Sequence, residues 1–248
     1  MKKPVVRLAL IAGLGSLFAL VCGAAHAEVV TIYTSANFAP LVLGDGRGLY
    51  PDLVDHLNRQ KIGSITFRLA YLPRKRLQVK MEDGTLDGIV IGMMPAWLND
   101  TARTRYLWSA AFSSDRYVLA SQQARPCLPG KLHKRTVGMT AGYVYQGLDK
   151  WIASSHLMRS DGVSDERNLE KLLLGRIDCV IVAESMARYY LRARGLAGKV
   201  HLETMPGQPS ERHFAALPAQ RAVFEQIAPV IKRLRDDPQW QRQTARYD

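Results

Sequence analysis

The segment from Asp83 to Gln122, DGTLDGIVIGMMPAWLNDTARTRYLWSAAFSSDRYVLASQ, decides the fold of this chain. Its apolar run Ile89-Val90-Ile91 is short, β-branched and flanked by glycines, which is typical of a buried strand in a parallel sheet. A second β-rich run, Tyr117-Val118-Leu119-Ala120, follows a loop with a proline, a tryptophan and two arginines. The segment therefore predicts two buried strands joined by an aromatic and basic loop.

The loop after the first of these strands is a candidate ligand site. In open α/β sheets, ligands bind beyond the carboxyl ends of the strands, where this loop emerges. Trp97 offers an apolar wall, and the guanidinium of Arg103 or Arg105 offers planar recognition of a carboxylate. We expect a small anionic ligand here. The alternative is a solvated loop whose arginines face water.

The motifs in this segment resemble those of the bacterial extracellular solute-binding proteins of family 3, the polar-amino-acid-binding type of periplasmic binding protein. That family reads G-x-x-D-x-x-x-x-G-M, then T-x-x-R-x-x-x-x-x-F-S-x-P-Y. The matching residues here are Asp87, Gly92, Met93, Arg103, Ser109 and Phe112. The chain departs from the pattern in three ways. Its loop before Arg103 is longer, Ala111 stands at the proline position, and the spacing from Arg103 to Ser109 is shorter. The shorter spacing leaves Arg103 and Arg105 as competing carboxylate ligands.

The resemblance implies an α/β fold with the two lobes of a type II periplasmic binding protein. Each lobe would be a mostly parallel sheet flanked by helices, and two hinge strands would join the lobes. Lobe 1 is expected to comprise residues 28–118 and 211–248, and lobe 2 residues 119–210. The strand-helix-strand alternation of residues 29–92 independently favours a parallel sheet.

The N-terminal residues 1–27 have a basic start, an apolar core and an Ala25-His26-Ala27 end, which is the plan of a cleaved secretory signal peptide. An uncleaved membrane anchor is the alternative. Without Lys2, Lys3 and Arg7 the formal net charge falls from +12 to +9. The remaining basic residues are scattered and lack aromatic interleaving, so nucleic-acid binding is not expected. We expect a periplasmic protein.

Two cysteines, Cys127 and Cys179, remain after the predicted cleavage. An even pair in an oxidising compartment indicates one disulfide, which would stabilise the fold by about 4 kcal/mol through loop closure. Two buried free thiols are the alternative. The chain has no CxxC motif and no His/Cys cluster, so neither a metal site nor a cofactor is expected.

The second strong signal is the stretch Thr136 to Tyr143, TVGMTAGY, which predicts a strand, a glycine turn at Gly142 and a helix start. Free N–H groups at a helix start suit a carboxylate. The family's v-G-v-x-x-G-y/t pattern fits here, and Thr140 and Tyr143 are therefore expected to contact the ligand.

Further positions bear on the site. The resemblance places Phe38 against the ligand, with a core ring as the alternative, and Met93, at the end of its strand, among the ligand-binding residues. It also implies that Glu184, after the strand of residues 177–182, holds an ammonium group; helix capping is the alternative. Arg74 and Arg76, near the start of the helix of residues 74–82, oppose the helix dipole. Their positions indicate either a nearby anion or ordinary surface arginines.

The leading functional interpretation is a monomeric periplasmic binding protein that delivers a small amino acid or organic anion to an ABC-type permease. One rival is a periplasmic enzyme on the same scaffold, similar to the cyclohexadienyl dehydratases, with Glu184 or His213 as general acid. No paired acid and base supports that rival. Another is a ligand sensor that acts on a membrane kinase.

Overall fold

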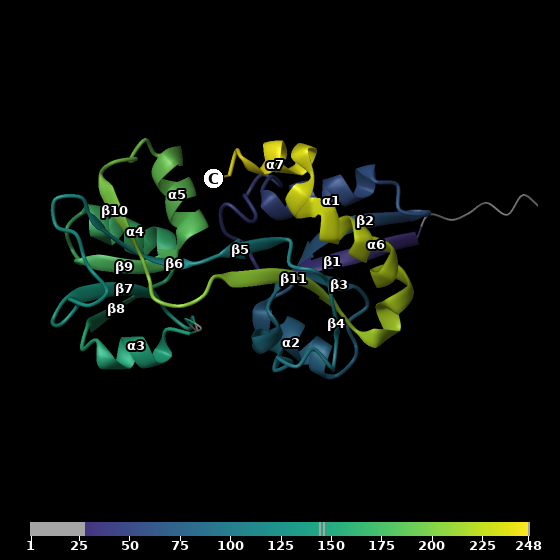
Figure 1. The fold of residues 1–248 in the computed structure, drawn as a ribbon, viewed down its shortest axis with the longest axis horizontal. Helices are drawn as coiled ribbons and strands as arrows, with labels where there is room; N and C mark the ends of the chain where they lie inside the picture. The colour runs from purple at the N-terminus through teal and green to yellow at the C-terminus, as the bar shows by residue number, and fades with distance from the viewer. Residues whose placement is uncertain (1–27, 144, 146, 248) are drawn as a thin grey trace, which may run out of the picture.

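The computed structural model describes residues 28–143, 145 and 147–247. The predicted signal peptide, residues 1–27, lies outside this range. None of the helices in the described range is long and apolar enough to cross a membrane. The described chain forms two lobes that lie side by side and are connected by extended segments (Figure 1).

The first lobe is built on a parallel core. Strand β1 pairs in parallel with both β2 and β3, so the predicted parallel arrangement of these strands is confirmed. Helix α1 begins at Leu49 with Pro51 in its first turn, where proline needs no hydrogen-bonded N–H. The elements are β1 (Glu28–Thr34), α1 (Leu49–Arg59), β2 (Ile65–Tyr71), α2 (Arg74–Glu82), β3 (Ile89–Met93), η1 (Pro95–Leu98) and β4 (Leu107–Trp108).

Two extended segments cross between the lobes. One contains β5 (Ser113–Asp115) and β6 (Tyr117–Gln122), and the other is β11 (Ser210–Ala216). Strand β11 runs antiparallel to β3, β4 and β5, and the sheet order is β2-β1-β3-β11-β4. The returning strand therefore makes the first sheet mixed, with its parallel part confined to the strands joined by helices.

The second lobe has a five-stranded sheet in the order β10-β6-β9-β7-β8. Strand β7 pairs in parallel with β8 and β9, whereas β6 runs antiparallel to β9 and β10. Its elements after β6 are β7 (Thr136–Thr140), α3 (Asp149–Ser154), β8 (Met158–Gly162), α4 (Asp165–Leu173), β9 (Cys179–Ala183), α5 (Glu184–Ala193) and β10 (Val200–Thr204).

The expectation of a helix directly after Gly142 is wrong. The described residues around Gly142 form turns, and the next helix, α3, begins only at Asp149. Gly142 has a φ of 74° and supplies a left-handed turn instead of a helix start. Anion binding at this place therefore does not depend on the N–H groups of a helix start.

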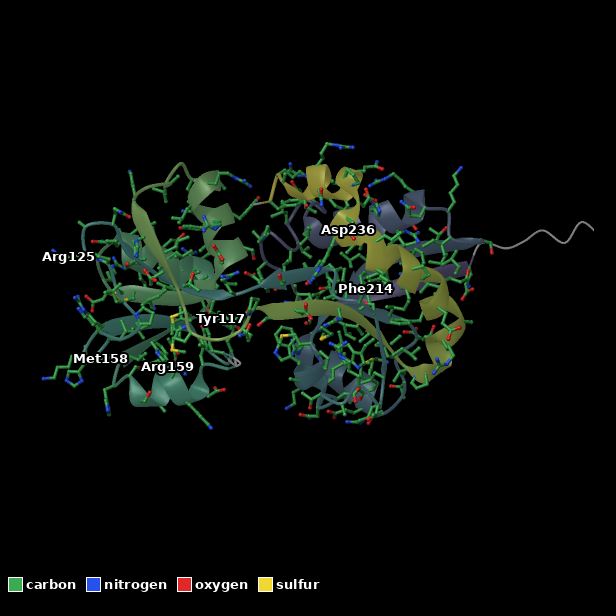
Figure 2. All side chains as sticks on the ribbon, in the orientation of Figure 1. Tyr117, Arg125, Met158, Arg159, Phe214 and Asp236 are labelled. Carbon is green, nitrogen blue, oxygen red and sulfur yellow. A yellow bond between two sulfur atoms is a disulfide. The ribbon has the colours of Figure 1, made fainter. Side chains whose placement is uncertain are left out.

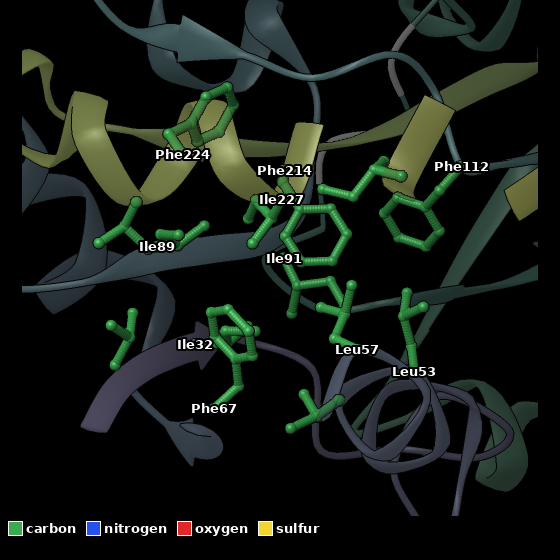
Figure 3. Close-up of a cluster of buried hydrophobic side chains, with 14 of the residues drawn as sticks. Ile32, Leu53, Leu57, Phe67, Ile89, Ile91, Phe112, Phe214, Phe224 and Ile227 are labelled. Carbon is green, nitrogen blue, oxygen red and sulfur yellow. The ribbon is translucent and has the colours of Figure 1, made fainter. Parts of the chain in front are cut away.

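Each lobe has its own hydrophobic core. In the first lobe, helices α1 and α6 (Arg221–Arg233) pack against the sheet through Leu57, Phe214 and Ile227, which are fully buried (Figure 3). The chain ends with η2 (Pro218–Gln220), α6, η3 (Leu234–Asp236) and α7 (Pro238–Thr244). A separate cluster around Leu169 and Val180 forms the core of the second lobe. Separate cores allow each lobe to move as a unit.

The predicted disulfide between Cys127 and Cys179 is present in the second lobe, with 6.3 Å between the two Cα atoms (Figure 2). It fastens the segment before β7 to the first residue of β9. The bond therefore restrains the second lobe without restricting the connection between the lobes.

Candidate ligand-binding site

Two arginines stack on Trp97 at the edge of the first lobe. Trp97 lies in η1, directly after β3, and its ring centroid is 4.3 Å from the Arg74 guanidinium carbon. The guanidinium carbon of Arg212, on the crossing strand β11, is 4.5 Å from the same ring. Both distances are in the range of a cation–π contact. The indole thus brings together two positive charges from distant parts of the sequence.

The positive charges of Arg74 and Arg212 have no carboxylate partner among the described residues. Within the described residues, no carboxylate lies within ion-pair distance of Arg74 or Arg212. The Arg74 Nε and Arg212 Nη1 atoms are buried and lack a hydrogen-bond partner there. Burial lowers the pKa of the Arg74 guanidinium, and the charge of Arg212 lowers it further. A bound anion would remove both penalties.

The facing edge of the second lobe carries Thr140, three tyrosines and Asp165. The Thr140 backbone N–H donates to the Tyr145 hydroxyl at 2.7 Å, and the Thr140 hydroxyl donates to Asp165 at the start of α4. Tyr145 also contacts the rings of Tyr117 and Tyr143, at centroid distances of 5.3 Å and 6.3 Å. The carboxyl end of β7 is therefore bordered by aromatic rings and by the carboxylate of Asp165.

The pKa values of Tyr143 and Tyr117 respond to charges on both sides of the molecule, including Arg74 and Arg212. Burial and then Asp165 raise the pKa of the Tyr143 hydroxyl to about 12, while Arg74 of the first lobe acts in the opposite direction. Burial also raises the pKa of Tyr117, with Arg212 lowering it and Asp165 raising it. Tyr117 is the first residue of β6, at the end of the segment that crosses between the lobes (Figure 2). Tyr143 and Tyr117 thus both respond to a cation of the first lobe or hinge and to Asp165 of the second lobe.

A cavity of about 220 Å³ opens beside Arg212 between the two lobes. Aromatic side chains from the first lobe form its apolar wall, and residues on either side of Glu184 close it from the second lobe. Its lining includes Phe38, Tyr50, Phe112, Asp115, Ala183, Ser185, Arg212, Trp240 and Tyr247. Predominantly apolar walls with a few polar groups are typical of small-molecule sites.

Three residues predicted to contact the ligand are not in the lining of the 220 Å³ cavity. Arg103 and Arg105 are exposed: the Arg103 Nη2 atom is 3.3 Å from His213 Nε2, and the Arg105 guanidinium lies 5.2 Å from the Tyr106 ring centroid. The Met93 residue is only 1 % exposed and packs in the core beside Ala215. The structure places Trp97 beside Arg74, Phe38 in the same cavity lining as Arg212, and Thr140 and Tyr143 around Tyr145 on the second lobe.

Glu184 is the first residue of α5 and is engaged by two arginines. Its Oε1 atom accepts from Arg188 at 2.6 Å, and its Oε2 atom is 3.5 Å from Arg116 Nε. Glu184 lines a second, open cavity of about 360 Å³ together with those arginines. Its neighbours Ala183 and Ser185, and not Glu184 itself, line the 220 Å³ cavity.

Arg212 and Asp165 were not anticipated from the sequence. Arg212 lies in a strand with no local motif, and its position depends on the pairing of β11 with Ser113 in β5. Asp165 has the sequence signature of an ordinary first-turn acid in a helix. Arg74 carried a usable signal, namely a cation at a helix start. Within the described range, no three His, Cys, Asp or Glu side chains gather as a metal site.

Comparison with known proteins gives matches at the level of structure. No protein-family model matches the chain, and no curated protein matches its sequence. A substrate-binding protein of an ABC uptake transporter from Streptococcus pneumoniae, solved with bound histidine, superposes with a TM-score of 0.68 at 17% identity, covering 88% of this chain and 92% of that one.

Two further solved structures share the same architecture. An ancestral arginine-binding protein bound to arginine matches with a TM-score of 0.67 at 14% identity, over 90% of this chain and 99% of that one. The GluR0 ligand-binding core from Nostoc punctiforme, in complex with L-glutamate, matches with a TM-score of 0.66 at 15% identity, over 88% and 98% of the two chains. These matches confirm the fold predicted from the motifs.

Proposed function

We propose that this chain, which has the two-lobed fold of the type II periplasmic binding proteins, captures a small carboxylate-bearing ligand between its lobes and delivers it to an ABC-type importer. The observation that carries the proposal is the pair of guanidiniums, Arg74 and Arg212, stacked on Trp97. Two half-buried guanidiniums, each with a buried nitrogen that lacks a hydrogen-bond partner and without a carboxylate partner in the described residues, favour an anionic ligand.

The carboxylate in this proposal binds to the first lobe. Each guanidinium presents donors in a planar fork that matches carboxylate oxygens, and the Trp97 ring holds both forks in place. Because Arg212 belongs to the crossing strand β11, its contact with the ligand is coupled to the hinge. Arg103 and Arg105, which are exposed, are assigned only a contribution to the positive potential around the opening.

The second lobe completes the site when the cleft closes. Tyr143 keeps 43 % of its surface exposed and therefore lies at the opening of the cleft, where it can cover a ligand held by the first lobe. Thr140 lies deeper, at the end of β7. Phe38 supplies an apolar surface in the adjoining cavity. Closure then stabilises the lobe arrangement that makes contacts to both sides of the ligand.

The proposed role implies export to the periplasm and a permease partner in the inner membrane. Residues 1–27 would direct the chain to the periplasm, and a monomer in the closed form would dock on an inner-membrane permease. A ligand sensor for a membrane kinase would bind its ligand in the same way. Uptake measurements separate the two: a strain lacking this protein loses uptake of the ligand if the role is transport and keeps it if the role is sensing.

A ligand screen tests the proposed binding. Native mass spectrometry of the protein purified from periplasm identifies a bound small molecule, and a thermal-shift panel of L-amino acids and mono- and dicarboxylic acids ranks candidates. A ligand at 100 times its dissociation constant stabilises the folded state by about 2.7 kcal/mol. The ligand should be recovered chemically unchanged. A panel in which only cations or neutral sugars stabilise the protein would overturn the proposal.

A further inference from the structure

Four connections meet at the outer end of the second lobe, opposite the edge that borders the first lobe. Strand β6 ends where its antiparallel neighbours β9 and β10 begin, and β7 and β8 run parallel to β9. The connections that lead into these strands therefore lie at one end of the sheet. They are residues 123–135 before β7, 155–157 before β8, 174–178 before β9 and 194–199 before β10. Figure 2 shows Arg125 and Met158 at this end, away from Tyr117.

Contacts between the connections fix their relative positions. The Gln123 backbone N–H donates to the Lys199 carbonyl oxygen at 3.0 Å, which joins the first connection to the fourth. The Lys134 backbone N–H donates to the His156 carbonyl oxygen at 3.3 Å, which joins the first connection to the second. The disulfide joins the first connection to the strand that follows the third. The outer end is therefore one continuous surface and not four independent loops.

The outer end carries most of the positive charge of the protein. Its four connections contain seven lysines and arginines but a single acidic residue, Asp178, so their formal net charge is +6. The chain from residue 28 onward has a formal net charge of +9, which leaves +3 for all its other elements. The cations are dispersed in the sequence, and the fold gathers them at one end of the second lobe. They are Arg125, Lys131, Lys134, Arg135, Arg176, Arg194 and Lys199.

Most of these cations have no ion-pair partner among the described residues. Arg135 lies 3.3 Å from Asp178, and Arg194 lies 3.4 Å from Glu170. For the other five cations, no described carboxylate lies within ion-pair distance, and all five are exposed. Exposed charges of one sign, gathered on one surface, produce a potential that attracts a partner of the opposite charge.

Large apolar side chains protrude among the cations of the outer end. Leu128 is 40 % exposed and lies in the same connection as Arg125 and Lys131. Leu174, which begins the third connection, is 66 % exposed, and Met158, the first residue of β8, is 51 % exposed. Protruding apolar side chains surrounded by lysines and arginines are typical of a surface that binds the interface of an anionic membrane.

We propose that the outer end of the second lobe binds an anionic phospholipid surface, with its exposed cations at the headgroup phosphates and Leu128 and Leu174 at the boundary of the acyl chains. The composition favours lipid over an acidic protein partner. Three of the five cations without an ion-pair partner in the described residues are lysines, and lysine is depleted at protein–protein interfaces. The inference rests on the proposed export and is independent of the proposed ligand.

Binding through the outer end leaves the cleft accessible. The carboxyl ends of β7 and β9, with Thr140 and Ala183, lie at the opposite edge of the second sheet. A protein held in this way stays in the layer next to the membrane, where the proposed permease lies. The local concentration of the protein at the permease is raised without a new contact between the two.

Co-sedimentation with vesicles tests the inference on protein purified from the periplasm, without added ligand. Vesicles of phosphatidylcholine alone are compared with vesicles of equal parts phosphatidylcholine and phosphatidylglycerol. The wild type should bind only the anionic vesicles, and binding should weaken as the salt concentration is raised. The variant Arg125→Gln/Lys131→Gln/Lys134→Gln/Lys199→Gln should bind the anionic vesicles about 100-fold more weakly.

A matched control removes the same number of exposed cations from the first lobe. The variant Lys61→Gln/Lys75→Gln/Lys232→Gln/Arg233→Gln has the same net charge as the outer-end variant and should keep the vesicle affinity of the wild type within about threefold. The melting temperatures of both variants verify that they fold.

A second variant tests the apolar contribution. Leu128→Gln/Leu174→Gln keeps every charge and should weaken binding to the anionic vesicles by about tenfold. Both side chains are exposed, so the substitutions leave the core of the second lobe intact.

Three outcomes would overturn the inference. They are no binding of the wild type to anionic vesicles at low salt, equal binding to both kinds of vesicle, and equal losses in the outer-end variant and its first-lobe control. Binding to poly-L-glutamate but not to vesicles would indicate an acidic protein partner instead and would also overturn it. None of these outcomes bears on carboxylate binding in the cleft, which the thermal-shift panel tests separately.

Discussion

At the scale of single residues, side chains at the cleft bring charged groups from distant segments of the sequence close together. The clearest case is Trp97, which holds Arg74 from a helix start and Arg212 from a crossing strand. The loop that carries Trp97 is in turn fixed by Asp100, a residue only 3 % exposed. The positioning of the proposed ligand site therefore depends on a carboxylate outside it.

Asp100→Asn is predicted to destabilise the protein by about 2–3 kcal/mol at neutral pH. The Asp100 carboxylate accepts from the backbone N–H groups of Thr104, Arg105 and Tyr106 and from Trp108 Nε1, at 2.8 to 3.2 Å and 2.7 Å respectively. An asparagine amide would turn its own N–H toward two of these donors. Urea unfolding measures the loss, with exposed Asp55→Asn as the control.

The stabilising effect of Asp100 also has a defined pH dependence. Burial raises the pKa of this carboxyl group, but the hydrogen bonds from Trp108, Arg105 and Thr104 outweigh burial, and the folded-state pKa is lowered. The folded state therefore binds the proton less readily than the unfolded chain, whose value is about 3.9. The difference between wild type and Asp100→Asn should be full above about pH 5 and shrink as the pH falls below 4. A difference independent of pH would contradict this account.

The sequence indicated some residues of the proposed site, and the remaining ones depend on tertiary structure. Trp97 follows β3 of the first sheet, and Thr140 and Tyr143 lie at the carboxyl end of β7 in the second, so the rule that ligands bind beyond the carboxyl ends of parallel strands indicates all three. Arg212 cannot be found that way, because its position depends on the register of β11 against β5. The exposed positions of Arg103 and Arg105 likewise depend on how the longer loop folds, which local spacing does not determine.

At the scale of elements, close packing of β3 against α1 depends on Gly92. This residue has a φ of 78°, and a Cβ placed on it would lie 2.0 Å from the Tyr50 hydroxyl. Gly92→Ala is predicted to cost about 2–4 kcal/mol, from backbone strain and from displacement of a buried ring. Urea unfolding measures it. Gly84→Ala is the matched control, because Gly84 has a φ of 71° with nothing within 4 Å. Equal losses in the two variants would show that Tyr50 imposes no packing constraint.

The disulfide is a second feature at this scale. It closes a loop with a sequence separation of 52 residues, so the double variant Cys127→Ser/Cys179→Ser is predicted to lose about 4 kcal/mol in the chain-entropy description. Urea unfolding with and without reductant provides the measurement. Reductant should lower the stability of the wild type and leave the double variant unchanged. A wild type that is insensitive to reductant after full reduction would contradict the prediction.

Several elements of the second lobe were not predicted from the sequence for an identifiable reason. Strand β8, MRSDG, is polar and has mostly exposed side chains, so it lacks the apolar alternation that indicates a strand. Strand β10, VHLET, is defined by its antiparallel pairing with β6 at the edge of the second sheet. Edge strands such as β8 and β10 are defined by backbone pairing, and the pattern of apolar and polar side chains does not reveal that pairing.

At the scale of the whole molecule, the C-terminal segment bridges the two lobes. The Tyr247 hydroxyl donates to Asp52 of α1 at 2.6 Å, and the Tyr247 ring lies 6.5 Å from that of Tyr189 on α5. The Arg192 guanidinium, also on α5, donates to the Arg246 carbonyl oxygen at 2.5 Å. Tyr247 also lines the 220 Å³ cavity. The chain end therefore contacts both lobes next to the cleft.

Arg192→Ala is predicted to loosen the contact between the lobes. Loss of this one hydrogen bond should weaken ligand affinity by about two- to tenfold and increase the radius of gyration of the ligand-free protein in solution scattering. Arg194→Ala is the control, because Arg194 pairs with Glu170 inside the second lobe. An identical radius of gyration and affinity in wild type and Arg192→Ala would show that the chain end does not influence closure.

The central claim, that the cleft closes on a carboxylate held by Arg74 and Arg212, is tested most directly by calorimetric titration of the best-stabilising carboxylate into three variants. Arg74→Gln and Arg212→Gln should each weaken binding by about 10- to 100-fold, because each removes a charged hydrogen bond, while Arg105→Gln should leave the affinity unchanged. Unchanged affinity in both Arg74→Gln and Arg212→Gln, or a loss confined to Arg105→Gln, would contradict the account.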